Sequence, residues 1–299
     1  MNAQNSSNPV KVAMLYFLLQ CLARLPLRVS QWLGRRLGSG LFLLRTRAAT
    51  VTEINLDACG MFPSAVKRDE FVKRRLQHMG QTVMETPAIW LGSRPRIERW
   101  ISDVTGVSLL DDAFAQGKGV IILLPHFGNW ELLNVFFAGR QPMTALYQPP
   151  EKAYLRPIMA AVRKNFGNDM VPTNRTGIAQ LYRCLQEGQV VTILPDQVPA
   201  SGDFIPFFGQ PAFTDRLLTR LTQKTGARVI TCVVIRQPAS QGFTIRFDLP
   251  DPDIYAKDPL QSMLAINRSI ENCVRVDPAQ YQWEYKRFRR YPEGTLPLY

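Results

Sequence analysis

The feature that most constrains the fold is an apolar run that ends in a proline and a histidine. Residues 121–124 have the character of a buried strand, Pro125 and His126 follow, and a Gly-Asn break precedes a helical pattern over residues 130–137. This order predicts a strand, a tight turn and a helix, as in α/β proteins. Ligands of such sheets bind at the carboxyl ends of the strands, so His126 is predicted to lie at a binding edge.

Two residues of this turn suit acid–base chemistry. His126 is one of only two histidines, and a neutral imidazole accepts a proton from a hydroxyl near neutral pH. Glu131 follows after the turn, so its carboxylate can fold back to the ring, fix the tautomer and stabilise the imidazolium. The alternative is a core histidine and a glutamate that the helix dipole favours. Asn129 is expected to cap the helix and to contribute to substrate binding.

Further strands are predicted to bring polar side chains to the same edge. Residues 190–194 form a nearly continuous β-branched run, typical of a strand buried on both faces, which leads to Asp196 and Gln197. These two are predicted to bind substrate around His126, although aspartate is also a common turn residue after proline. Residues 143–147, 228–235 and 243–247 are predicted to be the other strands. The predicted fold is therefore α/β, with a central mostly parallel sheet flanked by helices.

The first fifty residues differ from the rest in charge. Residues 12–23 are uncharged, which is short for a transmembrane helix, and no small-residue cleavage site follows. Arginines then alternate with apolar residues up to Arg47, as in a basic amphipathic helix on an anionic membrane. We expect an N-terminal helical membrane-associating segment at 1–47, which spans or lies on the membrane, and an α/β domain at 48–299. The alternative is a core helix with solvated arginines.

The overall charge restricts the partners. Lys and Arg total 36 against 24 Asp and Glu, which gives a net charge of +12. Such a surface attracts nucleic acid, anionic lipid or an acidic carrier protein. The five cysteines are scattered without a close pair, so the sequence indicates neither a disulfide framework nor a zinc site.

Four segments together resemble a known family. His-Phe-Gly-Asn-Trp-Glu at 126–131 resembles the His-x4-Asp/Glu motif of glycerolipid and lysophospholipid acyltransferases. With segments 193–197, 205–212 and 281–288, the chain is similar in particular to the late acyltransferases of lipid A biosynthesis, the lauroyl and myristoyl transferases. The resemblance extends from the N-terminal apolar segment to Gly294.

The resemblance implies an activity and a location. A fatty acyl group would pass from an acyl-carrier-protein thioester to a hydroxyl of a lipid A precursor, with His126 as general base and Glu131 as its orienting partner. The acyl carrier protein, the lipid A precursor and anionic lipids of the inner membrane, on its cytoplasmic face, are the expected partners, and nucleic acid is not. No cofactor or metal is expected, since the motif lacks the His-Glu-x-x-His spacing of zinc hydrolases.

Other residues have implied roles with open alternatives. Arg175, in the arginine-bearing segment of the family pattern, and Arg163 are expected to bind phosphate, because a guanidinium can hold an anion bidentately. Either could instead form a structural ion pair. Glu85 resembles a family acidic position on the helix that precedes the sheet, where a carboxylate could buttress the site or pair with an arginine, although a helix-surface glutamate fits equally well. The phenylalanines of 204–213 would form a wall of the acyl pocket, or ordinary core packing.

Two other functions fit part of the pattern. An acyltransferase of the same superfamily that acts on another glycolipid, an aminolipid or a lysophospholipid would share nearly every feature named above. A non-enzymatic membrane or nucleic-acid binder would explain the charge and the aromatic-basic segment 283–291. It would not explain the His126 motif at a strand end.

Overall fold

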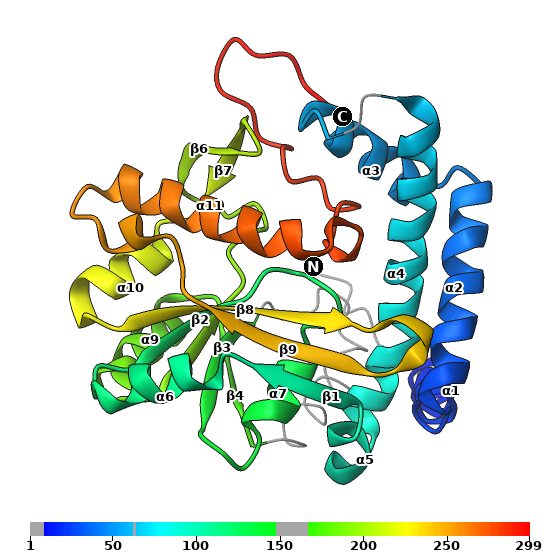
Figure 1. Ribbon diagram of the computed structural model, residues 1–299, viewed down its shortest axis with the longest axis horizontal. Coiled ribbons are helices and arrows are strands. Elements are labelled where there is room, and N and C mark those ends of the chain that lie inside the picture. The colour runs from blue at the N-terminus through cyan, green and yellow to red at the C-terminus, as the bar shows by residue number, and fades with distance from the viewer. Residues whose placement is uncertain (1–8, 62–63, 148–166) are drawn as a thin grey trace, which may run out of the picture.

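The chain has an α/β architecture built on one large sheet (Figure 1). The computed structural model describes residues 9–61, 64–147 and 167–299. The seven-stranded sheet has the order β1-β9-β8-β2-β5-β3-β4, and only the β8–β9 pair is antiparallel. The prediction of a mostly parallel sheet flanked by helices is thus confirmed. The strands are β1 (Ile101–Thr105), β2 (Val120–Leu123), β3 (Met143–Tyr147), β4 (Asp169–Pro172), β5 (Val190–Ile193), β8 (Arg228–Arg236) and β9 (Phe243–Asp248).

Helices cover both faces and one end of this sheet (Figure 1). One buried apolar cluster joins the sheet to α6 and α7, and a second joins it to α9, α10 and α11. Sheets with helices on both faces need strands that are apolar on both sides, as the β-branched runs of β2 and β5 are. The helices are α1 (Pro9–Ala23), α2 (Leu27–Leu43), α3 (Arg47–Ala58), α4 (Ala65–Leu91), α5 (Arg94–Glu98), α6 (Val107–Ala115), α7 (Leu132–Phe137), α9 (Arg175–Gln186), α10 (Leu217–Thr225) and α11 (Pro259–Val276).

A hairpin outside the main sheet was not expected from the sequence. β6 (Asp203–Phe207) and β7 (Gln210–Thr214) form a two-stranded antiparallel sheet. Phe207 is fully buried against Phe208, Tyr281 and Phe288. Of the two interpretations of the phenylalanine-rich segment, the structure therefore supports core packing.

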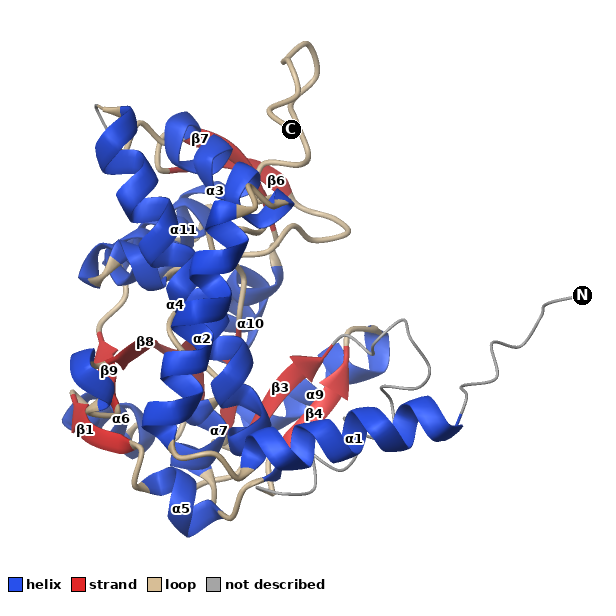
Figure 2. Ribbon diagram, turned by 90° about the vertical axis from the view of Figure 1, so that its right-hand side faces the viewer, coloured by secondary structure: helices blue, strands red, loops and turns tan. Residues whose placement is uncertain are grey.

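The helix α2 runs along α4 at very close range (Figure 2). Glycines make this approach possible: a Cβ at Gly38 would lie 2.1 Å from the Leu76 carbonyl oxygen, and one at Gly80 would lie 2.1 Å from the Gly34 carbonyl oxygen. The polar residues of α2 on this side are buried, while Trp32, Leu37 and Leu43 are exposed. The amphipathic helix predicted here therefore exists, with one face packed on α4 and an apolar surface exposed on the outside.

The length of the N-terminal helices limits how they can meet a membrane. Within the described part of the chain, no helix is by itself long and apolar enough to cross a bilayer. The pair formed by Val12–Ala23 and Leu27–Leu43 satisfies length and composition together, but the two helices meet at a bend of 118°.

Candidate active site

The turn after β2 is held between β8 and the C-terminal segment. The backbone of Gly128 has φ +58°, and a Cβ there would lie 1.8 Å from the Val234 carbonyl oxygen, so glycine is required. Gln280 accepts a hydrogen bond from the Gly128 N–H at 2.9 Å, and the Gln282 N–H donates to the His126 carbonyl at 3.1 Å. The C-terminal segment, more than 150 residues away in sequence, therefore fixes the backbone that carries His126.

His126 is paired with Asp196. Its Nδ1 lies 2.7 Å from Asp196 Oδ1, and its backbone N–H donates to Asp196 Oδ2 at 2.8 Å. Burial by itself would raise the pKa of Asp196, but the charge of His126 and these hydrogen bonds together hold that pKa below its usual value. An ionised Asp196 keeps the ring hydrogen on Nδ1, which leaves Nε2 as the proton acceptor.

This pairing differs from the one expected from spacing. Spacing along the chain predicted Glu131 as the orienting partner and Asp196 as a substrate-binding residue, whereas in the structure Asp196 holds the ring from behind and is only 2% exposed. Glu131 directly precedes α7 and accepts a hydrogen bond from Asn134 Nδ2 at 3.2 Å. Burial raises the pKa of Glu131, against the opposing influence of Trp90 and His126. Asp196, and not Glu131, therefore makes the hydrogen bond to Nδ1 of His126.

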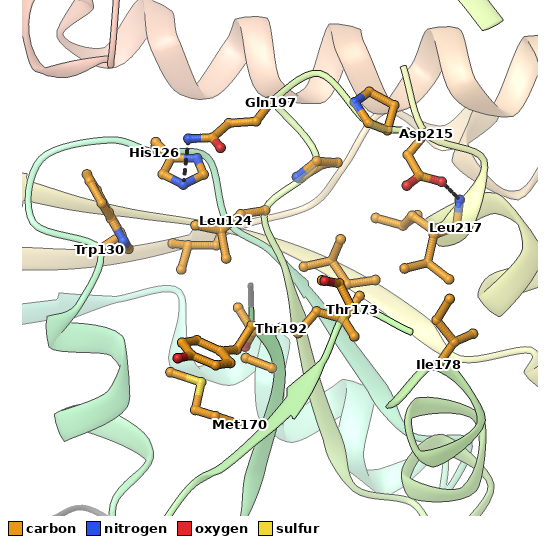
Figure 3. Close-up of a pocket in the computed structure, with 18 of the residues that line it drawn as sticks. Leu124, His126, Trp130, Met170, Thr173, Ile178, Thr192, Gln197, Asp215 and Leu217 are labelled. Carbon is orange, nitrogen blue, oxygen red and sulfur yellow. Dashed lines mark hydrogen bonds between the residues drawn. The ribbon is translucent and has the colours of Figure 1, made fainter. Parts of the chain in front are cut away.

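The free side of the ring faces a large cavity (Figure 3). The cavity has a volume of about 1330 Å³, and His126, Trp130 and Gln197 lie along it. Gln197 Nε2 lies 3.3 Å from His126 Nε2 and donates to Gln282 Oε1 at 3.1 Å. The edge of Trp130 packs on the imidazole at 4.9 Å between ring centroids. A hydroxyl that enters the cavity therefore meets an imidazole nitrogen with an amide donor beside it.

A buried ion pair supports the same turn from behind. Arg236, at the end of β8, donates to both carboxylate oxygens of Glu85 at 2.8 and 2.6 Å, and both residues are almost fully buried. Glu85 also accepts hydrogen bonds from Gln31 of α2 at 2.8 Å and from Asn129 at 2.9 Å. Glu85 is therefore not a helix-surface glutamate: it is buried, pairs with an arginine and supports the turn through Asn129. The connection also joins the N-terminal helices to the His126 turn.

The other predicted binding residues lie at different distances from the cavity. Asn129 is completely buried and donates to Glu85 instead of capping α7, and it does not line the cavity. Arg175 is the exposed first residue of α9 and is likewise absent from the cavity lining. Arg163 lies outside the described residues. Asp196 and Gln197 are the predicted pair that the structure brings to His126.

Two features escaped the sequence analysis. Gln282 lies in a segment that the resemblance had pointed to, but nothing in its spacing showed that its side chain would accept from Gln197. Arg236 ends a predicted strand without a nearby acid in sequence, since its partner Glu85 is 151 residues away. In the described ranges, no cluster of three or more histidine, cysteine, aspartate or glutamate side chains is arranged to hold a metal ion.

Comparison with known proteins gives a consistent result over almost the whole chain. A sequence profile described as "Bacterial lipid A biosynthesis acyltransferase" matches residues 6–290. The chain is 27% identical over 285 residues to the lipid A biosynthesis lauroyltransferase of Escherichia coli K12, which covers 94% of this chain and 92% of that protein. It is also 27% identical to the lipid A biosynthesis palmitoleoyltransferase of the same organism, over 92% of this chain and 90% of that protein.

One further relative is named for a different acceptor lipid. The chain is 26% identical over 179 residues to the phosphatidylinositol mannoside acyltransferase of Mycobacterium tuberculosis, which covers 57% of this chain and 56% of that protein.

Proposed function

Because the chain belongs to the bacterial lipid A biosynthesis acyltransferase family, we propose that it transfers a fatty acyl group from an acyl-carrier-protein thioester to a hydroxyl of a lipid A precursor. The observation that carries the proposal is the His126–Asp196 pair, whose second ring nitrogen, Nε2, lies on the cavity side next to the Gln197 amide. A histidine oriented by a buried carboxylate is the arrangement that activates a hydroxyl as a nucleophile.

The proposed reaction is a direct attack of the acceptor on the thioester. Nε2 of His126 takes the hydroxyl proton while the oxygen bonds to the thioester carbonyl carbon. The tetrahedral oxyanion then collapses, the carbon–sulfur bond breaks, and the imidazolium returns the proton to the thiolate of the carrier. Asp196 keeps the ring oriented and stabilises its positive charge, and the nearby Glu131 adds to that stabilisation.

Gln197 is the residue proposed to meet the reacting atoms beside His126. One of its amide hydrogens is directed to Gln282, and the other lies next to His126 Nε2. An amide in this position can donate to the acceptor hydroxyl before reaction and to the oxyanion during it, which lowers the barrier.

The proposal places the protein on the cytoplasmic face of the inner membrane. The supporting observation is the outer surface of the first two helices, where Met14, Phe17 and Leu18 of α1 are between 53% and 70% exposed. Arg28 and Arg36 of α2 are exposed nearby in sequence, and basic residues next to apolar ones favour an anionic bilayer. Segment 1–47 would then be the anchor and 48–299 the catalytic part.

A different acceptor within the same chemistry is the second candidate. It is favoured by the similarity to a phosphatidylinositol mannoside acyltransferase, although that match covers only about half of each chain. The His126 site would serve either acceptor, since it contacts only the hydroxyl and the thioester.

One experiment distinguishes these functions. Purified protein in detergent is incubated with acyl-carrier-protein thioesters of several chain lengths and with a lipid A precursor, a lysophospholipid, an aminolipid or a mannosylated lipid as acceptor. We expect the mass of one acyl chain to be added to the lipid A precursor. Acylation of another acceptor in its place would transfer the assignment to the second candidate. The absence of any transfer, with tight nucleic-acid binding instead, would support the non-enzymatic alternative.

A further inference from the structure

The cavity at His126 extends to both faces of the sheet. Leu133 and Met143 line it and belong to the apolar cluster of the α7 face. Ile193 and Leu218 also line it, and they belong to the cluster under α9 and α10. Successive side chains of a strand point to opposite faces, so the cavity has an α7 compartment and an α10 compartment that meet at the strand ends near His126.

Figure 3 shows members of both compartments. Met170 and Thr192 lie in one part of the cavity, and Ile178 and Leu217 lie in another. His126 and Gln197 lie on the side of the cavity nearer to α11. Acyl transfer brings two substrates to one base, so the site needs two spaces that meet at His126, one for the donor and one for the acceptor.

Charge divides the two compartments sharply. The lysines and arginines among the described lining residues are Arg220 and Lys224 of α10 and Arg289 of the C-terminal segment, which donates a hydrogen bond to Val198 in the loop before β6. Arg220 and Lys224 are one turn apart on α10 and therefore share a face. The α7 compartment is lined by apolar side chains such as Leu133 and Met143 together with the polar residues Asn134, Thr192, Tyr147 and Glu131, and no described lysine or arginine lies among them. An uncharged acyl chain fits the α7 compartment, whereas an anion would be attracted to the α10 compartment.

These three cations are available for a ligand. Within the described ranges, none of them forms a salt bridge, whereas Arg216, one turn earlier on α10, is bound to Asp203. Lys224 lies over the Tyr182 ring at 5.5 Å, and Arg289 lies over the Tyr285 ring at 5.6 Å and donates a hydrogen bond to the Val198 carbonyl at 3.4 Å. The acid that lines this side is Asp215, which accepts a hydrogen bond from the Leu217 N–H at 2.7 Å and interacts with Arg220 through its charge without forming a salt bridge.

We propose that Arg220, Lys224 and Arg289 form a binding site for a phosphate group of the acceptor lipid. The inference rests on the proposed acyl transfer and names how that site recognises its acceptor. The acyl chain of the donor would occupy the α7 compartment, and the phosphorylated acceptor would enter over α10 with its hydroxyl at His126. Three cations suit a doubly charged phosphomonoester better than the singly charged phosphodiester in the arm of a carrier protein.

The test compares one acceptor with and without its phosphates. The full-length protein, in detergent, is assayed with a phosphorylated lipid A precursor and with the same lipid after phosphatase treatment, for wild type, Arg220→Gln/Lys224→Gln and Arg289→Gln. The measured quantity is the ratio of kcat/KM for the two acceptors. We expect each cation lost to lower this ratio by roughly tenfold, mainly through KM for the phosphorylated lipid, as for a charge-assisted hydrogen bond.

Two matched substitutions serve as comparisons. Arg183→Gln changes an exposed arginine of α9 that does not line the cavity and should keep the wild-type ratio. Arg175→Gln tests the phosphate site expected from the sequence. The proposal is overturned if Arg220→Gln/Lys224→Gln keeps the wild-type ratio while folded, if only Arg175→Gln removes the preference, or if the variants raise KM for the carrier thioester alone.

A failure of the proposed acyl transfer can be distinguished from a failure of the phosphate site. If the wild-type protein transfers no acyl group to any acceptor, the melting temperature with each of the two lipids decides the inference separately. Greater stabilisation by the phosphorylated lipid that is lost in Arg220→Gln/Lys224→Gln would support the phosphate site. Equal stabilisation by both lipids would overturn it.

Discussion

At the scale of single residues, the pairing of His126 depends on strand order. The sequence placed His126 and Asp196 at the same sheet edge, because each follows a predicted strand. In the structure, β2 and β5 are parallel neighbours with Leu123 level with Ile193. Each of the two residues comes three positions after this pair, so the residues end side by side. Which strands are neighbours is decided by packing of the whole sheet, so spacing alone suggested the nearer carboxylate, Glu131.

Asp196→Asn should show whether His126 needs the carboxylate of Asp196 or only a side chain of the same size. Asparagine keeps the shape but does not hold a hydrogen on Nδ1 as a carboxylate does, so Nε2 loses its role as acceptor. We expect kcat to fall by about 10²- to 10⁴-fold with little change in melting temperature. Asp111→Asn, on the exposed surface of α6, is the matched control and should have wild-type kinetics. Normal turnover in folded Asp196→Asn would show that the ring needs no carboxylate at Nδ1.

Glu131 gives a prediction about pH and stability. Its pKa in the folded state is raised above the ordinary value of 4.5, so the stability it contributes is present at low pH and is lost as the pH rises through 4.5 toward the folded value. Glu131→Gln removes this loss. The free energy of unfolding of the variant relative to wild type should therefore increase between pH 4 and pH 7, measured by chemical denaturation in detergent. Glu70→Gln, at an exposed position of α4, is the control. A relative stability that falls over this range would contradict the sign of the shift.

At the scale of elements, the strands of the sheet centre were the most predictable part. The β-branched runs of β2, β5 and β8 are buried almost throughout, and their boundaries agree with the predicted ones within one or two residues. β1 was not predicted, because its five residues include polar side chains and form no apolar run, and all of them are partly or largely exposed. The β6–β7 hairpin was missed because its burial depends on α11 and the C-terminal segment, which are distant in sequence.

The α2–α4 contact predicts a strong dependence on glycine position. Gly38→Ala would place a methyl group 2.1 Å from the Leu76 carbonyl, whereas Gly40, in the same helix, has no atom within 4 Å of its would-be Cβ. We expect Gly38→Ala to destabilise the protein by about 1 to 3 kcal/mol through overpacking. Gly40→Ala should be neutral or stabilising by up to about 1 kcal/mol. Thermal unfolding of both variants in detergent measures the difference, and equal melting temperatures would mean that the two helices are not in close contact.

At the scale of the whole molecule, the apolar surface is concentrated on the N-terminal helices. In Figure 2, the N-terminal end of α1 projects beyond the other helices, while its C-terminal end is bound by Arg96, which donates a hydrogen bond to the Ala23 carbonyl. Phe17 is 70% exposed on α1, and Leu43 is 76% exposed at the end of α2. The buried Gln31–Glu85 hydrogen bond ties α2 to the turn that carries His126. The proposed anchor is therefore connected to the catalytic residues by packing, which would keep the cavity at a fixed height above the bilayer.

Acidic residues introduced on the exposed apolar surface of α1 should release the protein from membranes. Phe17→Asp/Leu18→Asp removes two exposed apolar side chains, each of which contributes roughly 1.5 to 3 kcal/mol when fully removed from water. We expect the fraction that sediments with anionic lipid vesicles to fall by more than tenfold in partition coefficient. Leu296→Asp alters a side chain that is 89% exposed in the C-terminal segment and should have no effect. Unchanged sedimentation of the α1 variant would remove α1 from the anchor.

His126 is the proposed base for acyl transfer, and replacement of His126 is the direct test of that role. The rate of acyl transfer from an acyl-carrier-protein thioester to a lipid A precursor is measured by product mass for wild type and His126→Ala, at matched protein concentration and after both melting temperatures are shown to agree. The account predicts a loss of about 10²- to 10⁴-fold in the variant, the usual contribution of a positioned general base. A folded His126→Ala protein that transfers the acyl group at nearly the wild-type rate would contradict it.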